Sequence, residues 1–344
     1  MTRLEGRTEG HLAELRDGHP EGRPAGRPEG RRTAARLRGR LRRTLLAGLV
    51  AAAVAVPVSA AASSDVPAPI PAATERAAPR EAYAANLANL AEAARTARDA
   101  GRTGRADRLQ AMAAEGTAQF LAFDGRARGR AVEVFGDLET ADRITVLVPG
   151  SDTTLDTYQR FRTGAVALHQ RLKAEHDRSA VVAWLGYDTP GTVSATVLTA
   201  GRAEEAAAGL APFLRRLEEL SVPEARLSLL CHSYGSVVCA RTATGPKVGD
   251  LVLYGSPGTG AASASELPTA ARVWAGRGAD DWIGRVPHVR VGAVGFGTDP
   301  VSPAFGARAF AAGRGAHSDY LKPGTESLDS LARIVLGTPE APRA

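Results

Sequence analysis

The segment around Ser233 has the arrangement of a reactive serine. An apolar run over residues 227–231 leads into a short turn with Ser233 at its tip, and a helix-forming run follows. A sharp strand-to-helix turn of this kind exposes the serine hydroxyl and requires small residues two positions before and after the serine. Gly235 meets the second requirement, and Cys231 stands at the first, where glycine is usual. The segment predicts a serine nucleophile, and a serine that only caps the helix is the alternative.

A serine nucleophile needs a base that takes its proton and an acid that orients the base. In this setting they follow in the order serine, acid, histidine. The histidines after Ser233 are His288 and His317. His288 opens an apolar run over residues 289–294 that is typical of a strand, whereas His317 lies in a loop rich in Gly, Ala and Arg before a helix. We predict that His317 is the base.

Three aspartates are candidates for the acid. Asp280 and Asp281 follow a strand expected to end at residue 275, and Asp299 lies in a later Gly-rich loop. Adjacent loop residues rarely point the same way, so we predict Asp281 and keep Asp280 as the open alternative. Asp299 precedes a proline and is typical of a turn.

Acyl chemistry at Ser233 also needs donors for the developing oxyanion. The first interior strand ends in Val148-Pro149-Gly150-Ser151, a turn free of bulky side chains. We expect the backbone amides of Ser151 and Tyr234 to supply these donors. Gly150 and His232, next to them in the chain, are expected to line the pocket. A tight loop without a catalytic role is the alternative for the turn.

The sequence lacks the common motifs for binding nucleotides and metal ions. The phosphate-binding pattern G-x-x-x-x-G-K-[ST] does not occur, and residues 255–260 lack G-x-G-x-x-G. His169 and His176 are seven apart, and neither H-E-x-x-H nor paired C-x-x-C is present. We expect no cofactor and no metal.

The two cysteines of the chain, Cys231 and Cys239, flank the turn that carries Ser233. The helix after the turn is expected to pack against the strand before it, which would allow a disulfide in an exported protein. Because free cysteine is commonly buried, we expect two buried thiols and keep the disulfide as the alternative.

The elements that must position these residues alternate between short apolar runs and amphipathic helices. Such alternation implies parallel β-α-β units, hence a mostly parallel sheet with helices on both faces and ligands beyond the carboxyl ends of the strands. A short helical segment and a β-hairpin are expected before it. The expected strands are 120–123, 131–135, 144–148, 180–184, 227–231, 251–254, 273–275 and 289–294, and the expected helices are 83–97, one around 109, 158–172, 210–220 and 328–336.

The charge of the 344-residue chain is unevenly distributed. The formal net charge is +6, and residues 1–44 alone hold 12 Arg against 6 acidic residues. The remaining chain is formally neutral, which removes the main support for a nucleic-acid partner.

An Arg-rich stretch before an uncharged run over residues 45–62 is typical of a secretory signal peptide. Its apolar core before Pro57 is shorter than a spanning helix needs, so we expect cleavage and no permanent membrane span. Arg42-Arg43 resembles a twin-arginine signal, and the Sec route stays open. We predict an exported protein, secreted or at the cell envelope, with a leader over 1–62, a Pro/Ala-rich linker over 63–79, a helical segment over 80–118 and one domain over 119–344.

With these residues placed, the chain resembles the α/β-hydrolase superfamily and, within it, an actinobacterial exported branch catalogued as a domain of unknown function. The likeness spans about residues 118–322, and the stretches that carry it are 120–124, 136–142, 148–150, 184–190, 232–236, 255–258 and 317–320. It implies the α/β-hydrolase fold and a triad of Ser233, Asp281 and His317. It also implies that residues 184–190 border the pocket, with Tyr187 and Asp188 as candidate lining residues. A role in fixing that loop is the alternative.

Taken together, these features predict an exported serine hydrolase that cleaves a carboxylic ester or related small acyl compound. An acyltransferase with the same triad and a non-catalytic envelope binding module are the alternatives. Oligomeric state is left open.

Overall fold

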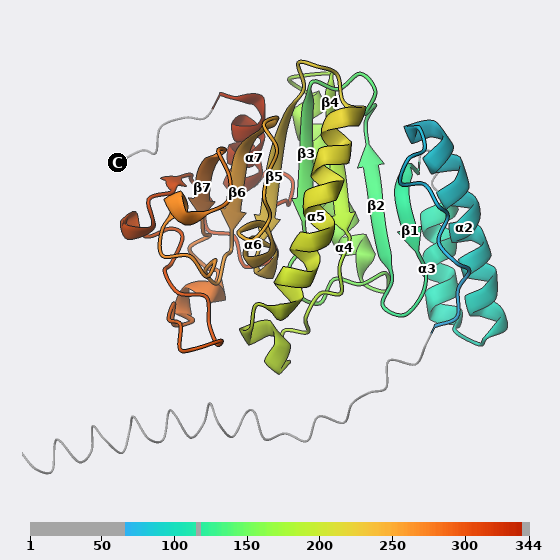
Figure 1. Cartoon of the computed structure of the whole chain (residues 1–344), viewed down its shortest axis with the longest axis horizontal. Helices are drawn as coiled ribbons and strands as arrows, with labels where there is room; N and C mark the ends of the chain where they lie inside the picture. Colours follow the sequence, from blue (N-terminus) through green and yellow to red (C-terminus); the bar gives the residue numbers. More distant parts are fainter. Residues whose placement is uncertain (1–65, 115–117, 339–344) are drawn as a thin grey trace, which may run out of the picture. The chain divides into compact units, whose positions relative to one another are not determined.

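The computed structural model describes residues 66–114 and 118–338, so the leader predicted over 1–62 lies outside the described residues (Figure 1). The described residues form an eight-stranded sheet in the order β1-β2-β4-β3-β5-β6-β7-β8. The strands are β1 Phe120–Asp124, β2 Arg130–Phe135, β3 Arg143–Val148, β4 Ser179–Leu185, β5 Arg226–His232, β6 Val248–Tyr254, β7 Arg272–Gly276 and β8 Arg308–Ala309.

The sheet is parallel from β4 to β8 and antiparallel at its other edge. β1 pairs with β2 as the predicted hairpin, with Phe123 opposite Ala131. The hairpin is not a separate unit, because β2 also pairs antiparallel with β4, with Val132 opposite Trp184. The mostly parallel sheet predicted from the alternation of strands and helices is therefore confirmed.

Helices cover both faces of the sheet (Figure 1). One face packs against α4 (Tyr158–Lys173) and α7 (Glu326–Leu336). The other packs against α5 (Gly201–Leu220) and α6 (Tyr234–Cys239). Among the described helices, none combines the length and apolar character needed to cross a lipid bilayer.

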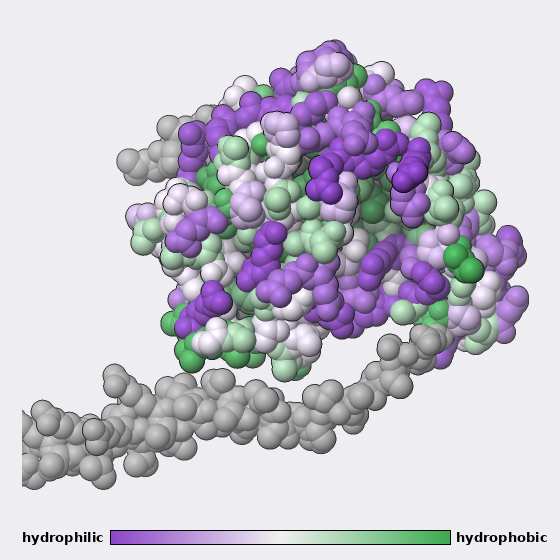
Figure 2. Space-filling model, viewed as in Figure 1, coloured by the Kyte–Doolittle hydropathy of each residue, from purple (hydrophilic) through white to green (hydrophobic). Residues whose placement is uncertain are grey.

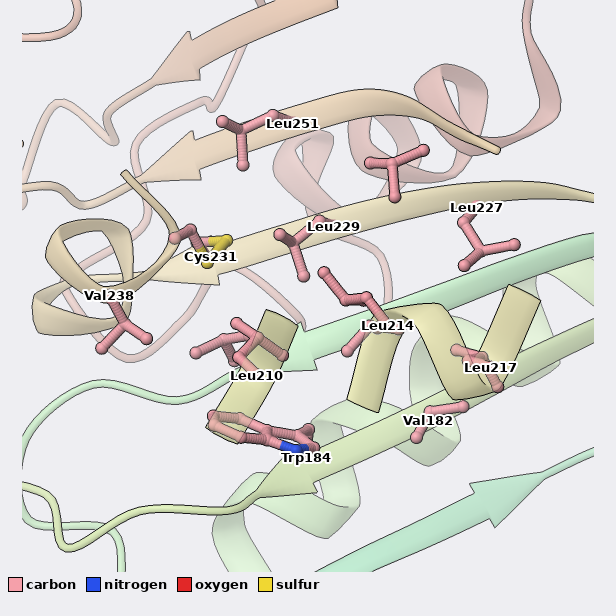
Figure 3. Close-up of a cluster of buried hydrophobic side chains, with 14 of the residues drawn as sticks. Val182, Trp184, Leu210, Leu214, Leu217, Leu227, Leu229, Cys231, Val238 and Leu251 are labelled. Carbon is pink, nitrogen blue, oxygen red and sulfur yellow. A yellow bond between two sulfur atoms is a disulfide. The ribbon is translucent and has the colours of Figure 1, made fainter. Parts of the chain in front are cut away.

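The two cores follow from the two-residue period of the strands. Leu229 of β5 and Leu251 of β6 point into the core beneath α5, and the next residue along β5, Leu230, points into the other. Figure 3 shows the first of these cores, where Leu210 and Leu214 of α5 pack toward the strands. Both faces of the central strands are apolar, as expected for a covered parallel sheet.

Cys231 and Cys239 form a disulfide, so the expectation of two buried thiols is wrong. α6 folds back against β5 and brings the two Cα atoms to 6.5 Å, within the range that a disulfide spans. Both residues are buried in the core beneath α5, where Figure 3 draws the sulfur bond. The bond covalently closes the turn that carries Ser233.

The strand predicted over residues 289–294 is also wrong. Only an isolated bridge joins Val291 to Val294, and both side chains are exposed. Gly292 and Gly295 have positive φ angles, so the segment turns back on itself instead of extending. The eighth strand is instead β8, whose two residues are exposed and have no apolar pattern to reveal them.

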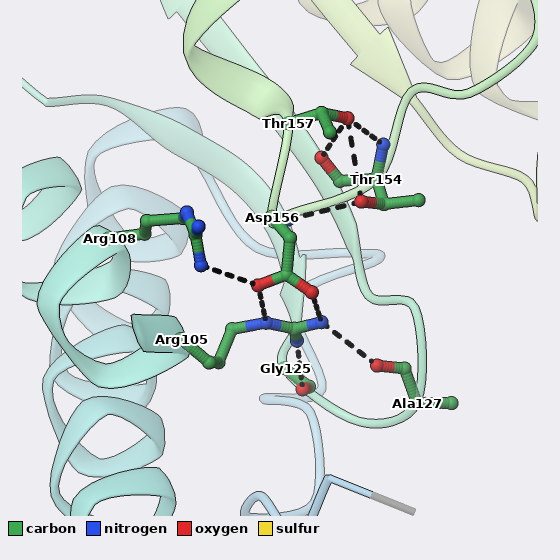
Figure 4. Close-up of polar contacts among 7 residues, drawn as sticks. All are labelled: Arg105, Arg108, Gly125, Ala127, Thr154, Asp156 and Thr157. Carbon is green, nitrogen blue, oxygen red and sulfur yellow. Dashed lines mark hydrogen bonds and ion pairs between the residues drawn. The ribbon is translucent and has the colours of Figure 1, made fainter. Parts of the chain in front are cut away.

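Two helices, α2 (Pro79–Asp99) and α3 (Thr103–Ala114), precede the sheet. A buried arginine joins α3 to the sheet domain (Figure 4). Arg105 donates from Nε and Nη2 to the two carboxylate oxygens of Asp156, at 2.7 and 2.8 Å. It also donates to the carbonyls of Gly125 and Ala127. Loss of Asp156 would leave the buried charge of Arg105 without a carboxylate partner.

The described part of the predicted linker is residues 66–79, and Pro79 already begins α2. Residues 66–78 are held against this domain. Thr74 Oγ1 donates to the carbonyl of Leu121 at 3.1 Å, and Asn89 Nδ2 donates to the carbonyl of Ile70 at 2.7 Å. Ala68 packs on the apolar cluster beneath α2. The Pro/Ala-rich composition thus describes a segment that packs through a few specific contacts.

Candidate active site

Ser233 lies between β5 and α6 in a backbone conformation that non-glycine residues rarely adopt. Its φ is 51° and its ψ is −125°. The turn brings α6 close to the end of β3, so a Cβ at Gly235 would lie 2.6 Å from the carbonyl oxygen of Val148. Only glycine fits there. The strained turn and the glycine two positions later are the local features that the sequence predicted.

His317 and Asp281 complete a hydrogen-bonded chain with Ser233. His317 Nε2 lies 2.9 Å from Ser233 Oγ, and His317 Nδ1 lies 2.8 Å from Asp281 Oδ1. A carboxylate can only accept, so Nδ1 carries the proton and Nε2 is left to accept from the serine hydroxyl. This is the tautomer in which the imidazole can act as a base.

The Asp281 carboxylate is fully buried and is held by three donors. Burial by itself would raise its pKa, but hydrogen bonds from His317, Tyr320 and the Ile283 amide outweigh it and lower the pKa below the ordinary value. The carboxylate therefore stays ionised at neutral pH and faces the imidazole as a negative charge.

The competing candidates point elsewhere. Asp280 is exposed and pairs with Arg314 at 2.9 Å. Asp299 pairs with Arg277 at 2.6 Å. His288 Nε2 lies 3.4 Å from the carbonyl oxygen of Ser256 and 3.6 Å from Asp299, away from Ser233. The structure brings together Ser233, Asp281 and His317, and it leaves the three alternatives outside the chain of hydrogen bonds.

Tyr320 is a site residue to which the sequence assigned no role. Its hydroxyl donates to Asp281 Oδ2 at 2.6 Å and accepts from the Gly278 amide at 3.0 Å. Burial, with the nearby carboxylate, raises the pKa of Tyr320 well above its usual range, so the hydroxyl remains a donor. The signal that could have found it is its position three residues after His317.

His232 fixes the backbone of the base. Its Nε2 lies 2.7 Å from the carbonyl oxygen of His317, and because a carbonyl only accepts, Nε2 carries the proton. Burial, with the nearby His317, lowers the pKa of His232 to about 3. The ring therefore stays neutral at physiological pH and packs between the rings of Tyr254 and His317, at 5.1 and 4.7 Å between centroids.

The turn after β3 passes directly over Ser233. A Cβ at Gly150 would lie 2.7 Å from Ser233 Cβ. Within the described residues, neither the Ser151 amide nor the Tyr234 amide donates a hydrogen bond to the protein. Ser151 lies in the turn after β3, and Tyr234 follows Ser233 in the turn after β5. The two turns meet at Ser233, so both amides are available as donors for an oxyanion.

The comparison with protein families gives a match that includes Ser233 and Asp281 and ends before His317. Residues 124–291 match the family model described as Alpha/beta hydrolase. Over these residues, just under half of the chain, the protein is similar to the alpha/beta hydrolase family. The hydrolase fold predicted from the sequence is confirmed.

Curated relatives of this chain come from mycobacteria. Uncharacterized protein Rv2079 of Mycobacterium tuberculosis is 31% identical over 256 residues, covering 64% of this chain and 39% of that protein. Uncharacterized protein Rv0963c of the same species is 33% identical over 143 residues, covering 38% of this chain and 53% of that protein. The chain thus spans about two fifths of the length of Rv2079 and about half of the length of Rv0963c.

Solved structures with a similar chain trace include two bacterial proteins. One is XC6422 from Xanthomonas campestris, described as an α/β serine hydrolase without lid, with 15% identity, a TM-score of 0.39 and coverage of 65% of this chain and 94% of that chain. The other is esterase LipW from Mycobacterium marinum, with 15% identity, a TM-score of 0.42 and coverage of 78% and 98%.

A pocket of about 820 Å³ opens beside His317. It lies between the turn after β3, the start of α4 and the loop after His317, and its lining includes Gly150, Ser151 and His232. The lining presents more apolar than polar surface, and its polar groups include the hydroxyls of Thr153, Thr157, Thr163 and Ser318 and the cations of Arg160 and Lys322. Among the described residues, no group of His, Cys, Asp and Glu side chains could hold a metal ion.

Tyr187 and Asp188 do not line this pocket. The buried Tyr187 donates its hydroxyl to the carbonyl of Pro149 at 2.7 Å and stacks on Trp184. Asp188 lies at the surface, 3.8 Å from Arg130 and 3.9 Å from Arg202. Tyr187 thus supports the turn that covers Ser233, which is the alternative role that the sequence left open.

Proposed function

We propose that this α/β hydrolase cleaves a carboxylic ester through an acyl-enzyme on Ser233. The observation that carries the proposal is the unbroken chain from Ser233 Oγ through His317 to the buried Asp281, at 2.9 and 2.8 Å. It begins at a strained turn that presents the hydroxyl beside the pocket. This combination of nucleophile, base and orienting acid is what acyl transfer to serine requires.

In the proposed reaction, Ser233 Oγ attacks the ester carbonyl carbon while His317 Nε2 takes the hydroxyl proton. The amides of Ser151 and Tyr234 stabilise the oxyanion of the tetrahedral intermediate. Its collapse breaks the bond to the alcohol, which leaves with the proton from His317. A water molecule, deprotonated by His317, then attacks the acyl-enzyme and releases the acid. Asp281 keeps the imidazole oriented and stabilises its charged form throughout.

The lining of the pocket supports a substrate with a polar part. Threonine and serine hydroxyls on two sides provide both donors and acceptors, and Arg160 provides a cation that has no carboxylate partner among the described residues. An alcohol or acyl group with several hydroxyls or a negative charge would satisfy these groups.

Export is part of the proposal. It rests on the Arg-rich leader and the apolar run over residues 31–62. The domain boundaries predicted from the sequence are proposed together with it. The Cys231–Cys239 disulfide supports it, because such bonds persist mainly in oxidising compartments.

The test is intact-mass measurement of the secreted protein before and after treatment with a fluorophosphonate, beside Ser233→Ala and Ser265→Ala. We expect one adduct on the wild type and on Ser265→Ala, which changes an exposed serine far along the chain from the turn. We expect none on Ser233→Ala, and a loss of ester hydrolysis of about 10⁶. An adduct that persists in Ser233→Ala would refute the assignment of the nucleophile, and a mass that includes residues 1–62 would refute cleavage of the leader. Absence of the protein from the secreted fraction and the cell envelope would refute export.

A further inference from the structure

Exposed large apolar side chains are concentrated on one part of the described surface. Seven of the eight such side chains fall in two short segments, 193–198 and 282–294. We call these seven residues the apolar rim. They are Val193, Leu198, Trp282, Val286, Val289, Val291 and Val294, with exposed fractions between 38% and 102%. Single exposed apolar residues are ordinary, whereas a group of this kind marks a surface that another molecule covers.

The two segments form one surface. The Gly295 amide donates to the carbonyl of Leu198 at 2.9 Å, which joins them through the backbone. In Figure 1 the yellow-green turn near residue 195 and the orange loops reach the lower edge of the molecule. Figure 2 shows green and pale green surface along that edge.

The apolar rim adjoins the hydrogen-bonded chain of the site. Trp282 follows Asp281 directly, and its ring centroid lies 4.7 Å from that of His317. Tyr234, next to Ser233, packs edge-on against Phe296 and donates its hydroxyl to the carbonyl of Thr199. A molecule that covers the rim would therefore lie next to the hydrogen-bonded chain of Ser233, His317 and Asp281.

The charge of these two segments indicates what kind of molecule covers the apolar rim. Residues 282–298 contain Arg285 and Arg290 and no Asp or Glu, and residues 189–200 contain no charged residue. Neither arginine has a carboxylate within 4.0 Å among the described residues. Two copies of this surface would place arginines against arginines, whereas a lipid surface with anionic headgroups would meet both the cations and the apolar side chains.

We propose that the apolar rim binds lipid surfaces that carry anionic headgroups. Trp282 and the valines enter the boundary between headgroups and acyl chains, and Arg285 and Arg290 lie at headgroup level. The binding surface is independent of the proposed ester hydrolysis. Only the consequence that Ser233 then meets esters lying in that surface rests on the proposed function.

The tryptophans provide a reporter of this contact. The chain has three, and Trp184 and Trp274 are 3% and 5% exposed, whereas Trp282 is 45% exposed. A change of emission on binding therefore reports the rim and not the leader. We would titrate the full chain, as Ser233→Ala to prevent turnover, with vesicles of phosphatidylcholine alone and of phosphatidylcholine with phosphatidylglycerol, and follow emission and co-sedimentation.

We expect a blue shift with phosphatidylglycerol vesicles that is absent in Trp282→Phe. Val289→Ser with Val291→Ser should weaken partitioning by at least about tenfold, whereas Ile70→Ser, which changes the eighth exposed apolar residue, should not. Arg285→Glu should weaken it about fivefold or more, and Arg102→Glu, another exposed arginine, should not.

Three results would overturn the proposal. Sedimentation with vesicles without a change in Trp282 emission would assign the contact to another part of the chain. A shift that grows with protein concentration and needs no vesicles would assign the rim to a second copy. Equal partitioning of the valine double variant and Ile70→Ser would show that the rim does not contribute. Because turnover is not measured, none of these results bears on the nucleophile.

Discussion

The two sides of the site are held by different means. On the serine side, the turn is set by backbone packing and a covalent bond: Gly235 lies against β3, and Cys231 is bonded to Cys239. On the acid and base side, long loops are held by side-chain hydrogen bonds, of which Tyr320 to Asp281 at 2.6 Å is the most direct. Substitutions that loosen the serine turn should therefore mainly lower the free energy of unfolding. Substitutions that remove hydrogen bonds around Asp281 and His317 should mainly lower kcat.

Among the residues that support Ser233, the largest effect is expected from the acid. Asp281→Asn keeps the shape but removes the charge that selects the imidazole tautomer, so kcat for ester hydrolysis should fall about 10⁴-fold. Asp280→Asn removes only an exposed pair with Arg314 and should stay within about threefold of the wild type. Steady-state kinetics of both variants would check this. Equal losses would show that the neighbouring aspartates share the role.

Next comes the glycine after the nucleophile. Gly235→Ala places a Cβ 2.6 Å from a backbone oxygen that cannot easily move, so the free energy of unfolding should fall by about 3 kcal/mol. Gly209→Ala on α5, where no atom lies within 4 Å, should instead raise it by about 0.5–1 kcal/mol. Urea unfolding measures both. A neutral Gly235→Ala would contradict the tight approach of α6 to β3.

The disulfide should affect stability more than rate. Cys231→Ala with Cys239→Ala opens a loop with a sequence separation of 8, which lowers the free energy of unfolding by about 2–3 kcal/mol on loop entropy. Ser233 keeps its amide hydrogen bond to Tyr254 and its packing under Gly150, so kcat should change less than about threefold. Thermal unfolding and kinetics of the double variant would test this pair of outcomes. A large loss of kcat with an unchanged free energy of unfolding would show that the disulfide acts on the rate and not on stability, contrary to the comparison made above.

The smallest expected change is in Tyr320→Phe. Loss of one charged hydrogen bond should lower kcat about tenfold, through a less well oriented His317. Tyr158→Phe removes the other buried tyrosine-to-carboxylate bond, to Glu133 at 3.0 Å, and should lower stability without lowering kcat. Kinetics and unfolding of this matched pair separate positioning from packing.

The effect of Tyr320→Phe on the free energy of unfolding should also depend on pH. Because the pKa of Asp281 is lowered on folding, its hydrogen bonds stabilise the protein above the ordinary value of 3.8 and are lost as the pH falls through the lowered pKa. The difference in unfolding free energy between wild type and Tyr320→Phe should therefore be greatest at neutral pH and shrink below about pH 4. A difference that does not depend on pH would contradict the charge-based role of Tyr320.

The sequence by itself determined the sheet, the helices and the serine turn. These features depend on residues close together in the chain: two-residue and 3.6-residue periods, and a small residue beside a sharp turn. The run 289–294 shows the limit of this reasoning, since its valines form an apolar run but lie exposed around Gly292 and Gly295.

Only the tertiary structure decided which aspartate meets His317, what Tyr320 does and whether the cysteines are bonded. Asp281 and His317 are 36 residues apart, and His317 and Ser233 are 84 apart. Loop conformation decides which of two adjacent side chains turns inward, and no local pattern encodes it. The apolar rim has the same origin, because it arises where two segments about 100 residues apart are joined by one backbone hydrogen bond, from Gly295 to Leu198.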